Sequence, residues 1–149
     1  YVMGSVVKVN SEVIVSAANI EGSGSGRLEV KQITTDNYQT SPQEDANGTM
    51  LLVQQPEASI IVAGTFQIGD ILNITNATTG FVNLLPSESD SVVFHWKDYV
   101  VTNLQEIDTQ YSKFRIPANS TVSLVRTPRT DSLLADWLIS ALDNALVGG

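Results

Sequence analysis

His95, several pairs of nearby carboxylates and a group of basic residues are the side chains best suited to chemistry. An imidazole titrates near neutral pH, so His95 is a candidate general base or metal ligand. A serine triad would need partners from elsewhere in the chain, and the sequence has no Gly-x-Ser-x-Gly motif. Phe94 and Trp96 flank the histidine, which favours a structural role on a strand. We therefore predict no catalytic residue, no metal ligand, no cofactor and no enzymatic activity.

Acidic residues stand close together in three places, among them Glu44-Asp45 and the pair Glu88 and Asp90. A glycosidase holds two carboxylates about 5–10 Å apart inside a cleft, so a small carbohydrate-active enzyme is one interpretation. The pairs lie in polar segments where solvated acids are usual, and "SESDS" has fewer oxygen ligands than a calcium loop needs. We predict instead that these four acids contact a ligand from loops.

Basic residues cluster late in the chain. Lys113 and Arg115 are two apart and therefore share one face of a strand, and Arg126 and Arg129 follow them. Such a patch is suited to acidic sugars, phosphate groups or a carboxylate between subunits. Pairing with nearby acids is the alternative explanation. Lys113, Arg115 and Arg126 are thus further candidate ligand contacts.

The composition favours one domain over residues 1–149, because 42% hydrophobic residues suffice for a single core. A net charge of −8 disfavours nucleic acid and anionic lipid as partners. The absence of cysteine excludes a disulfide framework and fits a chain made in a reducing cytosol, including one destined for a virus particle. The most apolar stretch, 133–147, contains two aspartates and is too short for stable membrane insertion.

Short β-strands dominate the expected structure. Segments of strand-forming residues are separated by Pro, Gly, Asn, Asp or Ser, a spacing that predicts an antiparallel sandwich or jelly roll. We expect N-terminal strands over 5–34, with an edge strand near its end, then a long loop over 36–48 and sandwich strands over 50–126. Within the sandwich, we predict a strand at 71–75, a turn at 76–80 and a return strand at 81–85. Asn73 and Asn76 would then lie on a solvent face or a subunit seam.

The end of the chain has a different pattern. Its apolar residues fall at 133, 134, 137, 138, 141, 142, 145 and 146, which predicts an amphipathic helix over 131–147. A leucine-rich helix of this length needs an apolar partner, either the sandwich core or neighbouring subunits. The candidate subunit-interface residues are Leu134, Trp137, Leu138, Leu142 and Leu146.

Two segments carry a family resemblance. In "IVAGTFQIGDILNITNATTGFVNLL" an apolar strand, a Gly-Asp turn, an alternating strand and an Asn/Thr/Gly turn lead to another apolar strand. A second such unit is "FRIPANSTVSLVRT". Between residues 60 and 125 the sequence resembles the C-terminal β-rich knobs of tailed-bacteriophage tail needles and tail fibres. It departs from many of them at its end, where their last strand often carries a Trp and Trp137 here lies in the helical pattern.

The resemblance implies a homotrimer of jelly-roll or tumour-necrosis-factor-like subunits at the virion tail tip, made in the cytoplasm of a bacterial host. Such a knob would be structural and adhesive, contacting the host cell envelope or plugging the tail during attachment and genome ejection. Its partners would be a polysaccharide, lipopolysaccharide or outer-membrane protein of the host and other tail proteins. One alternative is a capsid decoration or minor coat protein. Another is a carbohydrate-binding module in which Trp96, Tyr99 and Tyr111 form a sugar-stacking platform rather than core.

Overall fold

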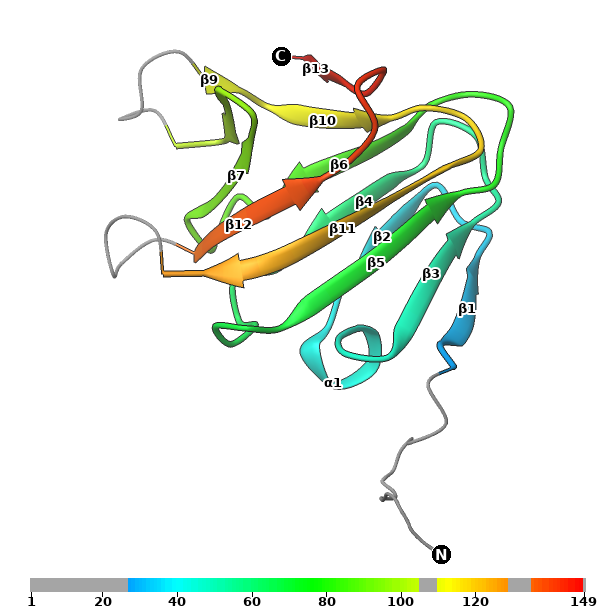
Figure 1. Cartoon of the computed structure of the whole chain (residues 1–149), viewed down its shortest axis with the longest axis horizontal. Coiled ribbons are helices and arrows are strands. Elements are labelled where there is room, and N and C mark those ends of the chain that lie inside the picture. Colours follow the sequence, from blue (N-terminus) through cyan, green and yellow to red (C-terminus); the bar gives the residue numbers. More distant parts are fainter. Residues whose placement is uncertain (1–26, 105–109, 129–134, 149) are drawn as a thin grey trace, which may run out of the picture.

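The computed structural model describes residues 27–104, 110–128 and 135–148, in which β-strands are the main regular structure. Two sheets face each other, with β1, β3, β5, β11 and β12 lying in front of β2, β4 and β6 in Figure 1. In spatial order, the eight-stranded sheet contains β1 (Glu29–Ile33), β3 (Thr49–Val53), β5 (Ile71–Asn76), β11 (Ser120–Thr127), β12 (Ala135–Ser140), β7 (Val92–Trp96), β8 (Tyr99–Thr102) and β9 (Gln110–Tyr111). The five-stranded sheet contains β13 (Leu146–Gly148), β10 (Lys113–Ile116), β6 (Val82–Pro86), β4 (Ser59–Val62) and β2 (Asn37–Gln39). The expected all-β class is therefore confirmed.

From β1 to β6 the chain changes sheet at every step. β1, β3 and β5 are neighbours in the eight-stranded sheet, and β2, β4 and β6 are neighbours in the other. Each of these neighbouring pairs is parallel, with Glu29 opposite Thr49 in one sheet and Asn37 opposite Ser59 in the other. This half of the described chain therefore winds as a solenoid, and each of its turns, or coils, places one strand in either sheet.

The prediction of purely antiparallel pairing is wrong. Six of the eleven pairings between described strands are parallel. Parallel neighbours need a crossover connection, and among β1 to β6 a strand of the opposite sheet provides it in place of a helix. For the same reason the predicted return strand over 81–85 does not pair with its predecessor, because β5 and β6 belong to different sheets. A tight turn looks the same in sequence whether it closes a hairpin or moves the chain between sheets.

The second half of the chain runs back along the first. β10 is antiparallel to β6, and β11 is antiparallel to β5, with the turn at Pro117–Asn119 between them. β12 then lies between β11 and β7, and β13 adds to the edge of β10. Every strand of this half therefore extends a sheet that the coils began.

The core fills the space between the two inner faces. Alternate residues of each strand point inward, as in β5, where Leu72 and Ile74 are buried while Ile71 is exposed. Phe66 meets the fully buried Trp137 edge to face, with ring centroids 5.1 Å apart. Burial of these side chains together with Ile60, Leu84 and Phe114 of the five-stranded sheet joins the sheets into one apolar cluster.

The predicted C-terminal helix is wrong over the described residues, since 135–140 form β12 and 146–148 form β13. β12 pairs on both sides, with β11 and β7, so its backbone bonds are satisfied within the sheet. A central strand with adjacent apolar residues such as Trp137, Leu138 and Ile139 fits a helical spacing by chance. Tertiary pairing overrides that local pattern.

The segment 36–48 is not one long loop, because it contains β2 and the short helix α1 (Pro42–Asp45). Pro42 at the start of α1 has the fixed φ that suits a first helical turn. The edge-strand prediction is confirmed, as β1 ends the eight-stranded sheet. Predicted strands before residue 27 lie outside the described residues. Within the described ranges, no helix has the length and apolar character required to cross a membrane.

Candidate interaction surfaces

The outer face of the eight-stranded sheet carries a row of apolar side chains across three neighbouring strands, β5, β11 and β12, which ends at His95 of β7. The register places Ile71 beside Val125, Val125 beside Leu138, and Leu138 beside His95. Leu138 is 44% exposed and Ile71 is 38% exposed. Val30, at 57%, extends the apolar character to the edge strand β1. The row is therefore open to a partner.

Hydroxyl and amide side chains fill the rest of this face and bond to one another. The hydroxyls of Thr75 and Thr121 lie 2.7 Å apart, and Ser123 donates to Asn73 Oδ1 at 2.8 Å. At the outward positions of the described strands, the ionisable side chains are His95 and Asp136, whose Nε2 and Oδ1 lie 3.3 Å apart. This outer face is thus nearly uncharged on a chain of net charge −8.

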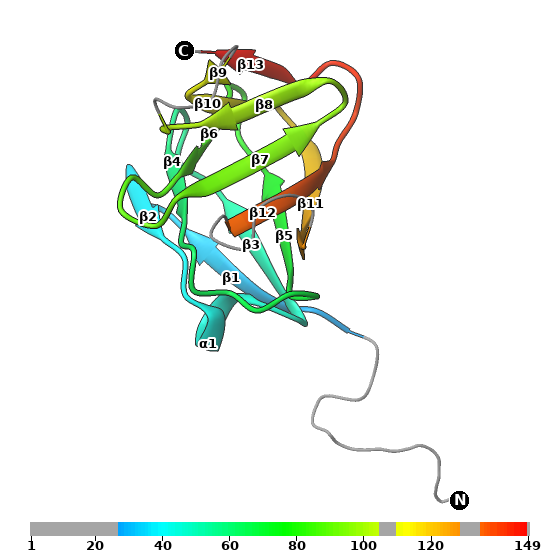
Figure 2. The ribbon, with the colours of Figure 1, turned by 90° about the vertical axis from the view of Figure 1, so that its left-hand side faces the viewer.

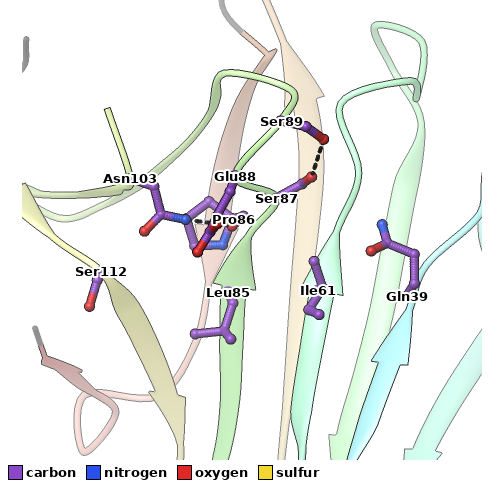
Figure 3. A pocket seen from close by; sticks show the side chains of 9 residues that line it. All are labelled: Gln39, Ile61, Leu85, Pro86, Ser87, Glu88, Ser89, Asn103 and Ser112. Atoms are coloured by element: carbon purple, nitrogen blue, oxygen red, sulfur yellow. Dashed lines mark hydrogen bonds between the residues drawn. The ribbon is translucent and has the colours of Figure 1, made fainter. Parts of the chain in front are cut away.

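A shallow groove lies on the five-stranded sheet, at the end of β6 (Figure 3). Its floor is the row Gln39, Ile61 and Leu85, which are paired across β2, β4 and β6. The loop after β6 forms its wall and brings Glu88 to the rim, and the role of Glu88 as a ligand contact stays a prediction. Asp90 instead accepts a hydrogen bond from the Gly64 backbone N–H at 3.0 Å and holds the loop in place.

Glu44 and Asp45 of α1 both lie close to Lys31 of β1. Lys31 Nζ lies 2.8 Å from Glu44 Oε1 and 3.2 Å from Asp45 Oδ1. The Tyr38 hydroxyl donates to Asp45 at 2.9 Å, and the Ser41 N–H donates to it at 2.8 Å. Asp45 is fully buried, so it is unavailable to an outside ligand and its predicted role as a ligand contact is wrong. Because aspartate is a polar residue, its burial could not be foreseen from the sequence.

These contacts shift three pKa values. The hydrogen bond with Glu44, followed by the one with Tyr38, raises the pKa of the Lys31 ammonium. The hydrogen bond from Lys31 lowers the pKa of Glu44. Burial raises the pKa of the Tyr38 hydroxyl. The cluster fastens α1 to the edge strand, which is a structural role.

The predicted basic residues do not form one patch. Arg115 pairs with Glu57 at 3.2 Å and lies over the Phe81 ring, 4.3 Å from its centroid. Lys113 is two residues away on the same outer face of β10. Arg126 belongs to the other sheet and donates to the backbone carbonyls of Thr127 and Asp136. Pairing with a nearby acid, the alternative explanation, describes Arg115, whereas Arg126 donates to backbone carbonyls instead.

The predicted interface leucines also lie apart. Trp137 is fully buried on the inner face of β12, so it is unavailable to another subunit and that prediction is wrong. Leu138 lies on the outer face of the same strand, whereas Leu146 is outward on β13 in the five-stranded sheet. Leu142 is exposed between these strands, and Leu134 lies outside the described residues. The single helical stripe therefore does not exist.

The sequence analysis missed the uncharged sheet face because the face is assembled by register. One signal was available: the outward positions of 50–53, 71–76 and 120–127 contain no charged residue. Over the described part of the chain, no group of three or more His, Cys, Asp or Glu side chains gathers as a metal site would require.

A scan of the chain against protein-family models finds no match, and a search of curated proteins finds none either.

Proposed function

We propose that the chain is a non-enzymatic structural and adhesive domain of a virion, placed at the tip of a phage tail needle or tail fibre. In this proposal it assembles as a homotrimer and contacts the host cell envelope during attachment. It is attached to the other tail proteins, and it binds a polysaccharide, lipopolysaccharide or outer-membrane protein of the host surface.

The observation that carries the proposal is the nearly uncharged outer face of the eight-stranded sheet. Copies of a chain with net charge −8 repel one another, so they approach at least cost through a face whose carboxylate, Asp136, is buried and lies beside His95. That face offers the exposed apolar row with Ile71 and Leu138. Burying such a row between copies removes apolar surface from water without leaving a buried charge.

The position of Trp137 also supports the proposal. The sequence pattern placed this residue in a helix, unlike the strand tryptophan near the end of many fibre knobs. It lies on strand β12 instead, so it is a strand residue as in those knobs, although β13 follows β12 as the last described strand. Two weak sites on separate subunits of such an assembly would also gain avidity from being joined.

The mass of residues 1–149 in solution tests the proposal, measured by light scattering or sedimentation. We expect the mass of three chains. Leu138→Lys should yield the monomer, because it places three like charges in the interface. Leu146→Lys is the matched control, since Leu146 is similarly exposed, at 48%, on the other sheet. A wild-type monomer overturns the proposal, and loss of assembly only in Leu146→Lys moves the interface to the five-stranded sheet.

A further inference from the structure

We propose that a binding site for neutral hexose residues lies where β8 and β9 of one sheet approach β13 of the other. The inference deepens the proposed function, on which it rests, by assigning a chemical class to the surface component that is bound. Figure 2 shows these three strands at the same end of the molecule. Side chains from all three line one pocket of about 420 Å³ between the sheet edges.

Aromatic rings form one wall of this pocket. Tyr99 stacks on Trp96, with centroids 5.7 Å apart and an angle of 23° between the rings. Tyr111 meets Tyr99 edge to face at 5.7 Å. Trp96 is buried, but Tyr99 is 40% exposed, so a ring backed by a second ring is open to solvent. The apolar face of a hexose, made of C–H groups, packs on such a ring.

A charged pair stands at the rim. Lys97 Nζ lies 3.1 Å from Asp143 Oδ1 and 4.7 Å from the centroid of the Trp96 ring. The lysine supplies donors and the aspartate supplies acceptors, which are the groups that sugar hydroxyls use. Because the two charges balance each other, the site has no excess positive charge to attract an acidic sugar. The net charge of −8 disfavours acidic sugars further.

The backbone at Lys97 gives an independent reason to assign it a role. Its φ is 54°, in the left-handed region that glycine and asparagine adopt at least cost. It stands in the short turn that joins β7 to β8. The backbone conformation of this turn disfavours lysine. The reason for a lysine here is therefore the position of its side chain over Trp96.

Affinity electrophoresis of residues 1–149 in gels containing dextran, mannan or galactan tests the site, with polygalacturonate as the acidic comparison. We expect at least one neutral polymer to retard the protein and polygalacturonate not to. Tyr99→Ala should weaken retardation at least about tenfold by removing the stacking ring. Lys97→Asn keeps a residue suited to the turn and should weaken it by about threefold or more, through loss of the donors.

Phe81→Ala is the aromatic control, because the Phe81 ring is covered by Arg115 and does not line this pocket, and it should bind like the wild type. Circular dichroism of each variant shows whether it folds. Retardation by none of the neutral polymers overturns the site, as does binding that Tyr99→Ala leaves unchanged or binding of polygalacturonate alone. A trimer that binds no polymer overturns only this site, whereas a monomer that binds one overturns only the proposed function.

Discussion

The two sheets are alike on their inner faces and different on their outer ones. Inward positions of both are apolar and buried, from Leu51 in one sheet to Ile60 in the other. On its outer face the five-stranded sheet carries Lys113 and Arg115, the latter paired with Glu57. The outer face of the eight-stranded sheet carries hydroxyls, amides and exposed aliphatic side chains instead.

The difference shows that folding and surface use are specified separately in this chain. Inward residues are constrained by packing, because buried side chains must fit a close-packed interior and a buried polar group without a partner costs free energy. Outward residues are free to vary without changing the fold. A face that avoids charge on an acidic protein is therefore informative about what it meets, whereas a buried leucine is informative only about packing.

The largest expected effect comes from comparing two asparagines of β5, one on each side of the eight-stranded sheet. Asn76 points inward and is fully buried, and its Nδ2 donates to the carbonyls of Gly80 and Ile116 at 2.8 Å. Its Oδ1 accepts from the Thr78 N–H and hydroxyl. Asn76→Ala should therefore lower the free energy of unfolding by about 3 kcal/mol, because these buried groups lose their partner.

Asn73, on the outward side, is the matched control. It is half-buried and accepts one hydrogen bond from Ser123, so Asn73→Ala should cost less than about 1 kcal/mol. Urea unfolding of both variants measures the difference. Equal losses would show that the two faces of this sheet do not differ in how strongly they constrain polar residues. The same pair corrects the sequence analysis, which placed both asparagines on a solvent face or a seam.

The sequence was sufficient for most strands between β3 and β11, but it was insufficient for β2, β12 and β13 and for the partners of every strand. Alternation in 71–76 identifies which residues of β5 are buried, because side chains of a strand point to opposite faces. Nothing in the same residues tells a hairpin from a step between sheets. Strand pairing depends on segments that are distant in the sequence. β5, for example, pairs with β3, which precedes it in the chain, and with β11, which follows it.

The candidate surfaces could be predicted from the sequence only in part, for the same reason. The pairing of Trp96 with Tyr99 follows from a short turn between two strands, so local sequence brings those rings together. Tyr111 and the β13 residues reach them only through the tertiary fold. Asp45 shows the reverse error, since a charged residue in a polar segment was expected in solvent and is buried by Lys31, Tyr38 and Ser41.

A smaller effect tests the charged outer face of the five-stranded sheet. In a double-mutant cycle of Arg115→Met and Glu57→Gln, the coupling free energy should be about 0.5 kcal/mol and should fall with added salt, because the pair is partly exposed. Part of the loss in Arg115→Met should persist at high salt, since the guanidinium also covers the Phe81 ring. Coupling well above about 1 kcal/mol, or none at any salt, would contradict a face organised by a solvated ion pair.

The smallest expected effect concerns the ion pair of Lys31 and Glu44 at the edge of the eight-stranded sheet. Lys31 and Glu44 pair beside β1, on the side where α1 packs, and not on the outer face. The pKa of Glu44 is lowered by the hydrogen bond from Lys31, so its carboxylate stabilises the fold above the unfolded-state pKa. This contribution is lost as pH falls through the folded-state pKa.

Glu44→Gln removes that contribution. The difference in free energy of unfolding between wild type and Glu44→Gln should be present near neutral pH and should decrease as pH falls below the ordinary glutamate pKa of about 4.3. It should be small because Glu44 is exposed and solvent screens the pair. In a Lys31→Met background the difference should be absent at every pH. A gap that stays constant with pH, or survives the loss of Lys31, would show that Glu44 acts through its helix and not through this ion pair.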